Sequence, residues 1–136
     1  MALFYADSSA LVKLVLDEPE SDALRAFIAG ADLVSCALVL TELPRAVRRA
    51  AVDDPRLPLD VLIGRAHELL EAVALLPLDA GLLRAAGALE EPGLRALDAV
   101  HVAAAVDLSP LDAFVGYDER QSAAARLAGL RTVRPG

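Results

Sequence analysis

The sequence predicts an α/β fold in which a mainly parallel sheet is covered by helices on both faces, as a three-layer α/β/α sandwich. Short apolar segments of strand length alternate along the chain with longer segments in which apolar residues recur at helical intervals. This alternation indicates a parallel sheet, because a parallel neighbour is reached through a crossover connection. Hydrophobic residues form 56% of the chain and aromatic residues only 4%, so we expect a core of Leu, Val and Ala.

The first part of the chain contains two strand–helix units. Residues 2–6 (ALFYA) are predicted to form a buried strand, and a helix is expected from Ser8, with Ser8 and Ser9 as its caps. Residues 19–30 have a proline near their start and a glycine at their end, which is typical of a helix. A second strand is predicted over residues 33–37.

The same alternation continues to the end of the chain. The predicted elements are, in order, a helix from Ala37 to Val52, a helix over 58–73, a strand over 74–78, helices near 80–90 and 94–107, a strand over 113–117, a helix over 119–129 and a strand over 130–134. The clearest loop, DDPRLP at 53–58, is too short to separate two domains. We therefore expect one domain over residues 1–136.

Composition and charge limit the functions to consider. A net charge of −7 argues against a general polyanion-binding protein, because non-specific nucleic-acid affinity comes mostly from Lys and Arg. A nucleic-acid contact must therefore be local, and the densest group of cations is Arg45, Arg48 and Arg49, which otherwise form an ordinary solvated helix face. No apolar run reaches the roughly 18 residues of a membrane span, so we expect a cytoplasmic protein without membrane contact.

Four acidic residues are candidates for one site. Asp7 and Asp118 directly follow predicted strands, and the carboxyl ends of parallel strands form the edge where ligands bind. Asp98 lies at helical intervals from apolar residues, and a buried carboxylate needs a compensating group. Glu42 lies on the third predicted helix.

Each acid also has an ordinary structural explanation. Asp7 and Asp118 fit as helix caps, and Glu42 fits as an i,i+3 partner of Arg45. Asp98 fits as a helix cap, or as a partner of Arg95 or His101. No single acid therefore decides between a structural and a functional role.

Four segments together carry a resemblance to a known family. They are FYADSSALVKLVLDEPES, LTELPRAVRR, LRALDAVHVAAA and FVGYDERQSAAARLAGL, and they extend over most of the chain. In this order they resemble the successive motifs of PIN-domain ribonucleases, most closely the VapC toxins of bacterial toxin–antitoxin pairs. The resemblance implies a PIN-like fold and a hydrolase that cleaves RNA phosphodiester bonds with water activated by Mg²⁺ or Mn²⁺.

The resemblance also assigns residues. The metal-binding acids of the family fall on Asp7, Glu42, Asp98 and Asp118. The sequence departs from the family pattern at Gly116, where Thr or Ser is usual, and at Pro44 in the helix that carries Glu42. Loss of the hydroxyl at position 116 is expected to affect the position of Asp118. Pro44 is tolerable if its helix begins near residue 40 or 41, because a proline in the first turn loses no hydrogen bond.

The residue types agree with this chemistry. Clustered carboxylates without a set of His or Cys ligands select hard cations such as Mg²⁺ and Mn²⁺, and not zinc. A bound dication would compensate Asp98 and lower the pKa of a bound water. We expect Asp7 and Asp98 as principal ligands, with Glu42 and Asp118 as ligands or as groups that orient metal-bound water. Weaker candidates for contact with the RNA substrate are Ser8, Lys13, Arg45 and Arg49.

The resemblance further implies a homodimer and a small antitoxin of VapB type whose segment covers the acidic crevice. Two alternatives remain open. One is a housekeeping PIN nuclease in RNA maturation. The other is a non-catalytic acidic α/β module that binds a basic partner, which the charge of −7 permits.

Overall fold

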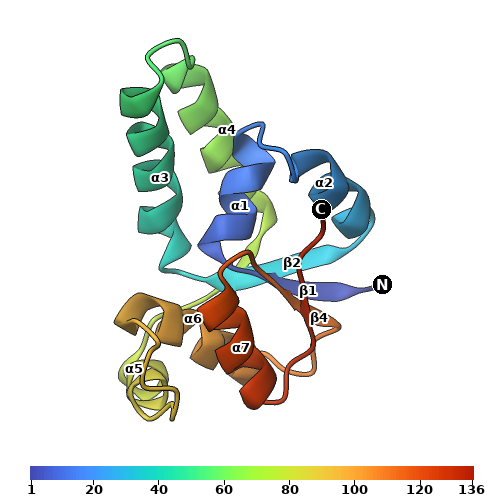
Figure 1. Cartoon of the computed structure of the whole chain (residues 1–136), viewed down its shortest axis with the longest axis vertical. Helices are drawn as coiled ribbons and strands as arrows, with labels where there is room; N and C mark the ends of the chain where they lie inside the picture. Colours follow the sequence, from blue (N-terminus) through green and yellow to red (C-terminus); the bar gives the residue numbers. More distant parts are fainter.

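A computed structural model of the chain describes all residues 1–136 and contains five strands and seven helices (Figure 1). The strands are β1 (Leu3–Ala6), β2 (Asp32–Cys36), β3 (Ala74–Leu76), β4 (Ala113–Val115) and β5 (Thr132–Val133). They form one sheet in the order β3-β2-β1-β4-β5, and every pair is parallel. The predicted α/β fold with a parallel sheet is therefore confirmed.

The helices cover both faces of this sheet (Figure 1). They are α1 (Ser8–Val15), α2 (Ser21–Ile28), α3 (Val39–Asp53), α4 (Leu59–Ala72), α5 (Ala80–Gly87), α6 (Ala96–Asp107) and α7 (Glu119–Leu127). The first four lie on one face, and α5, α6 and α7 lie on the other. No helix combines the length and the apolar character that a membrane span needs.

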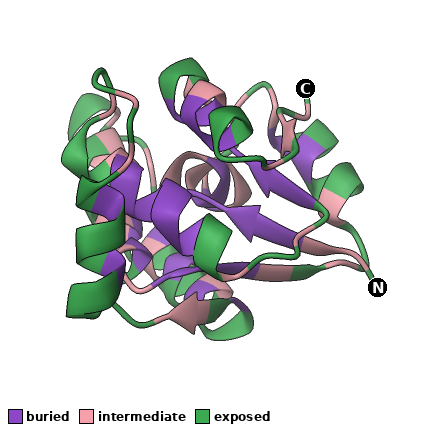
Figure 2. Cartoon of the chain, turned by 90° about the horizontal axis from the view of Figure 1, so that it is seen from below, coloured by how far each residue is buried: buried purple, intermediate pink, exposed green.

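Two apolar clusters fill the space between the layers, because successive strand residues point to opposite faces. Phe4 and Ala6 of β1 pack with the first four helices, whereas Tyr5 packs with Phe114 and the helices of the other layer. Figure 2 shows the buried residues concentrated in the sheet and on the helix faces that cover it. Cys36 is fully buried in the second cluster, as its apolar neighbours in the sequence predict.

Several predicted boundaries shift at identifiable residues. The strand predicted over 74–78 ends at Leu76, directly before Pro77, which has no N–H for a ladder. The strand predicted over 113–117 ends at Val115, before Gly116. The helix predicted from residue 94 begins at Ala96, because Arg95 has an extended backbone.

Pro44 lies inside α3 and not in its first turn, because the helix already begins at Val39. The condition under which Pro44 loses no hydrogen bond is therefore not met. The helix nevertheless continues to Asp53. Its start is held by backbone N–H groups of Thr41 and Glu42, which both donate to the carbonyl of Leu38 at 3.1 Å. Glu42 is thus anchored upstream of the proline.

Candidate active site

The four predicted acids come from four different elements to one edge of the sheet. Asp7 follows β1, Glu42 lies near the start of α3, Asp98 lies in the first turn of α6, and Asp118 directly precedes α7. Burial is the main cause that raises the pKa of Asp7 and of Asp98, and the neighbouring acids add to it: Glu42 for Asp7, and Asp118 and Glu42 for Asp98. Residues that are far apart in the sequence therefore share one acidic region.

Asp7 is the most buried of these acids, with only 2% of its surface exposed. Its Oδ1 accepts hydrogen bonds from the backbone N–H of Ala10 at 3.0 Å and from Oγ of Ser9 at 2.7 Å. Burial raises the pKa of Asp7, and the bonds from Ser9 and Ala10 offset that effect only in part. The site therefore holds a carboxylate whose charge lacks full compensation from the protein.

The cap of α1 is Asp7, and the prediction that Ser8 and Ser9 cap this helix is wrong. Asp7 has the extended backbone of an N-cap residue, and its side chain accepts from Ala10. Both serines lie inside the first turn of the helix. Ser9 instead connects two parts of the site, because its Oγ accepts from the N–H of Tyr117 at 3.0 Å and donates to Asp7.

Glu42 is held by His101 and not by Arg45. The Nε2 of His101 donates to Oε1 of Glu42 at 2.6 Å, and Nδ1 lies 2.7 Å from the hydroxyl of Tyr5. Burial by itself lowers the pKa of His101, but hydrogen bonds toward Cys36 and Glu42 outweigh it and raise the pKa. Glu42 contributes more than Cys36, because its Oε1 lies 2.6 Å from Nε2, whereas the sulfur of Cys36 lies 3.8 Å from Nδ1.

His101 is buried to 1% exposure. Its role as the partner of Glu42 is not predicted from the sequence. No local pattern signals this contact, because the partners lie on α3 and α6, in opposite layers, and meet only across the end of the folded sheet.

Asp98 is half-buried at the start of α6, with 30% of its side chain exposed. It does not cap this helix, because the N-cap residue is Arg95. The Nε of Arg95 lies 4.0 Å from Oδ2 of Asp98, and Arg95 is largely exposed, so this ion pair is weak. Burial and the neighbouring Asp118 raise the pKa of Asp98 more than Arg95 lowers it.

Asp118 is the N-cap of α7, where its Oδ1 accepts from the N–H of Gln121 at 2.9 Å. Gln121 is buried and donates from Nε2 to the backbone carbonyl of Asp98 at 3.4 Å. The start of α7 is thereby tied to the first turn of α6. The two acids Asp98 and Asp118 are neighbours for this reason.

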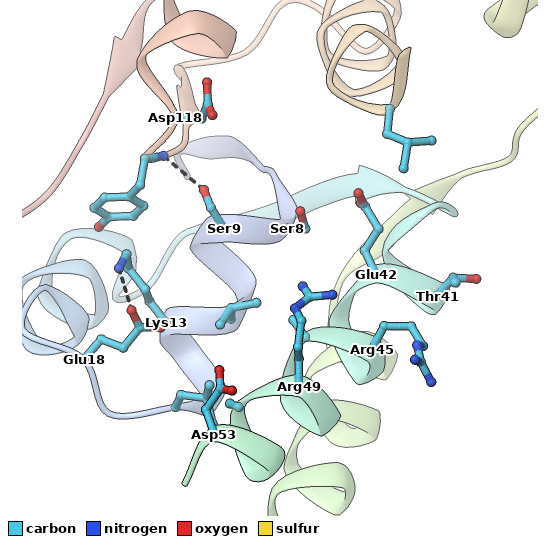
Figure 3. A pocket seen from close by; sticks show the side chains of 16 residues that line it. Ser8, Ser9, Lys13, Glu18, Thr41, Glu42, Arg45, Arg49, Asp53 and Asp118 are labelled. Carbon is cyan, nitrogen blue, oxygen red and sulfur yellow. Dashed lines mark hydrogen bonds and ion pairs between the residues drawn. The ribbon is translucent and has the colours of Figure 1, made fainter. Parts of the chain in front are cut away.

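A pocket of about 810 Å³ opens between α1 and α3 and is lined by Glu42 and Asp118 but not by Asp7 or Asp98 (Figure 3). Glu42, Asp118 and Ser8 lie at one end, and Arg45 and Arg49 line it from α3. The remaining lining residues are Ser9, Val12, Lys13, Leu16, Glu18, Thr41, Ala46, Ala50, Asp53, Leu97 and Tyr117. The pocket therefore joins an acidic end to a wall that carries two arginines.

The cations around this pocket differ in availability. Arg45 and Arg49 are exposed and form no ion pair. Arg48 is exposed on the same helix but does not line the pocket. Lys13 lines it, but its ammonium group is 3.0 Å from the carboxylates of both Glu18 and Glu20. Arg45 and Arg49 are thus the cations that are free to meet a ligand.

Comparison with known proteins gives consistent matches. The family model described as PIN domain matches residues 4–127. Ribonucleases VapC47 and VapC35 of Mycobacterium tuberculosis (strain CDC 1551 / Oshkosh) are 35% and 36% identical over 140 residues, and each alignment covers 98% of both chains. Ribonuclease VapC46 of Mycobacterium tuberculosis strain H37Rv is 38% identical over 137 residues, with 99% of both chains covered.

Two solved structures show the same fold. The crystal structure of VapBC2 from Rickettsia felis, bound to a DNA fragment from their promoter, matches with a TM-score of 0.70 at 14% identity over 98% of this chain and 99% of that chain. The crystal structure of PAE2754 from Pyrobaculum aerophilum matches with a TM-score of 0.66 at 21% identity over 97% of this chain and 84% of that chain.

Proposed function

The chain belongs to the PIN domain family, and from this premise we propose that it is a metal-dependent endoribonuclease that acts as the toxin of a toxin–antitoxin pair. The observation that carries the proposal is the shared acidic edge of Asp7, Glu42, Asp98 and Asp118 beside a pocket with two free arginines. Full-length similarity to relatives named ribonuclease VapC supports the same activity.

The donor chemistry of these acids fits Mg²⁺ or Mn²⁺, which are hard cations that prefer oxygen ligands. The raised pKa values of Asp7 and Asp98 support a cation site, because a cation would favour their charged forms. As the side chains lie in this structure, no three His, Cys, Asp or Glu side chains gather closely enough to enclose an ion. We propose that Asp7 and Asp98 would be the main ligands, with Glu42 and Asp118 completing the set.

The protein groups around the acids have separate tasks in this proposal. When bound, Mg²⁺ or Mn²⁺ would lower the pKa of a water molecule and neutralise charge on the phosphate. His101 holds the carboxylate of Glu42 toward the pocket, and Ser9 holds that of Asp7. Arg45 and Arg49 would bind RNA phosphates and align the scissile bond beside the acids.

We extend the proposal to partners and location. The match to the VapBC2 structure supports a small antitoxin of VapB type as the partner. We propose that this partner covers the acidic pocket. Exposed apolar side chains, including Leu40, Val52 and Val61, offer surface for a homodimer or for the antitoxin. An RNA substrate and a free cysteine agree with a reducing cytoplasm.

Two experiments separate this proposal from its alternatives. Cleavage of single-stranded RNA by the purified chain with Mn²⁺ distinguishes a nuclease from a non-catalytic acidic module. Co-expression with the neighbouring gene, followed by purification, distinguishes a toxin from a housekeeping nuclease. A toxin forms a complex with the neighbouring gene's product in which cleavage is inhibited, whereas a nuclease of RNA maturation forms no such inhibited complex.

A further inference from the structure

Gly116 lies directly against the carboxylate of Asp7. Ala6 of β1 pairs with Val115 of β4, and the N–H of Asp7 donates to the carbonyl of Val115 at 3.2 Å. Gly116 is the residue that follows β4, so Asp7 and Gly116 lie side by side where β1 and β4 end. A Cβ atom at position 116 would lie 2.8 Å from Oδ2 of Asp7 and 3.1 Å from its Cγ.

The backbone conformation at position 116 does not explain why a glycine is present there. Its φ is not positive, unlike that of Gly30, Gly129 and Gly136. Any residue could adopt this backbone, so the requirement for glycine is one of space. Gly116 therefore bears directly on Asp7, and its expected effect on Asp118 stays a prediction.

The neighbours of Gly116 have little freedom to move away. The carboxylate of Asp7 is buried, and its Oδ1 is held by Ser9 and Ala10. On the other side, a Cβ would lie 3.1 Å from Cε1 of Phe114, whose fully buried ring stacks on Tyr5 at a centroid distance of 5.4 Å. Contacts shorter than 3.0 Å force a shift, and a shift of Asp7 would break hydrogen bonds that orient it.

We propose that Gly116 is a positioning residue, whose missing side chain provides the space that the carboxylate of Asp7 occupies. This chain departs from the PIN pattern of Thr or Ser at this position, and the departure is coupled to the placement of Asp7. A side chain at 116 displaces the carboxylate from its bonds to Ser9 and Ala10. The consequence for metal binding rests on the proposed function, whereas the steric coupling does not.

A double-mutant cycle on metal-free melting temperature tests the steric coupling. The variants are Gly116→Ala, Asp7→Ala and the double variant, and Gly64→Ala is the matched control because a Cβ there meets nothing within 4 Å. We expect Gly116→Ala to lower the melting temperature by about 5 °C or more. In the Asp7→Ala background the same change should cost much less. Gly64→Ala should not lower the melting temperature, because alanine is the better helix former inside α4.

A local packing role for Gly116 against Phe114 would give the same loss in both backgrounds and would overturn the proposal. If Gly116→Ala alone fails to fold, the double variant decides: recovery of folding supports the proposal, and no recovery contradicts it.

Titration calorimetry with Mn²⁺ tests the consequence for the site. We expect Gly116→Ala and Gly116→Ser to weaken Mn²⁺ binding by about tenfold or more, in line with other residues that orient ligands. If the usual family hydroxyl is instead helpful here, Gly116→Ser will bind Mn²⁺ as tightly as the original protein or more tightly, and the proposal is wrong. If the original protein binds no Mn²⁺, the proposed function fails, while the melting cycle still decides the steric coupling.

Discussion

The imidazole of His101 donates a hydrogen bond to Glu42 at 2.6 Å across the end of the sheet, although the two residues are 59 positions apart. They come from helices in opposite layers, α6 and α3. This bond places the carboxylate of Glu42 beside the acids that follow β1 and β4. It also leaves Nδ1 to pair with the hydroxyl of Tyr5 at 2.7 Å.

Replacement His101→Leu is expected to destabilise the protein by about 1–3 kcal/mol, because it leaves Glu42 and Tyr5 without their buried partner. The measurement is urea unfolding without metal. Tyr5→Phe is the matched control, since it removes only the contact at Nδ1 and should cost about 1 kcal/mol. A His101→Leu protein as stable as the original would show that this bond contributes nothing.

The stabilisation by His101 should also depend on pH. The folded pKa of His101 is raised to about 10, above the value of about 6.5 for an unfolded histidine. The contribution is therefore complete below about pH 6.5 and is lost as the pH rises toward the folded pKa. The difference in unfolding free energy between the original protein and His101→Leu, measured at pH 6, 8 and 10, should become smaller as the pH rises. A difference that grows with pH would mean that the pKa of His101 is lowered in the folded protein, and would contradict this prediction.

Asp98→Asn should leave the metal-free fold as stable as before or slightly more stable. Burial and Asp118 raise the pKa of Asp98, so its charge is unfavourable to the fold, and Asn removes that charge at nearly constant size. Metal at a hundredfold excess over Kd should stabilise the original protein by about 2.7 kcal/mol and the variant clearly less. Thermal melts with and without Mn²⁺ measure both effects. A structural role as partner of Arg95 would instead lower the metal-free melting temperature and keep the metal response.

Replacing Arg45 and Arg49 with Ala should weaken RNA binding and flatten its salt dependence. Each lost phosphate contact should reduce the slope of log K against log salt by about 0.7 for single-stranded RNA. Arg48→Ala is the matched control, because Arg48 lies on the same helix outside the pocket. Binding titrations at several salt concentrations test this, and an unchanged slope in the double variant would place the RNA elsewhere.

The layered fold could be predicted because its signals are local. Apolar segments of strand length and helical periodicity located all five strands and seven helices, and only the ends shifted, at residues such as Pro77 and Arg95. The serine caps were misassigned because Asp7, Ser8 and Ser9 are all good N-cap residues, and only the backbone geometry selects Asp7.

The candidate site could be predicted only in part. Strand ends and motif resemblance named the acids, because those features can be read along the chain. The bond between His101 and Glu42 and the contact of Gly116 with Asp7 could not be named. They depend on where α3 and α6 start at the end of the sheet, in opposite layers, and on the register of β1 with β4, which no local pattern specifies.

RNA cleavage by the purified chain, in Mn²⁺ and in excess EDTA, tests the central claim most directly. We expect cleavage of single-stranded RNA in Mn²⁺, no cleavage in EDTA, and recovery when Mn²⁺ is restored. Asp7→Asn should be inactive in every condition, because it loses a charged group from the acidic edge. Full activity in excess EDTA, or an Asp7→Asn protein that cleaves as fast as the original, would contradict the account.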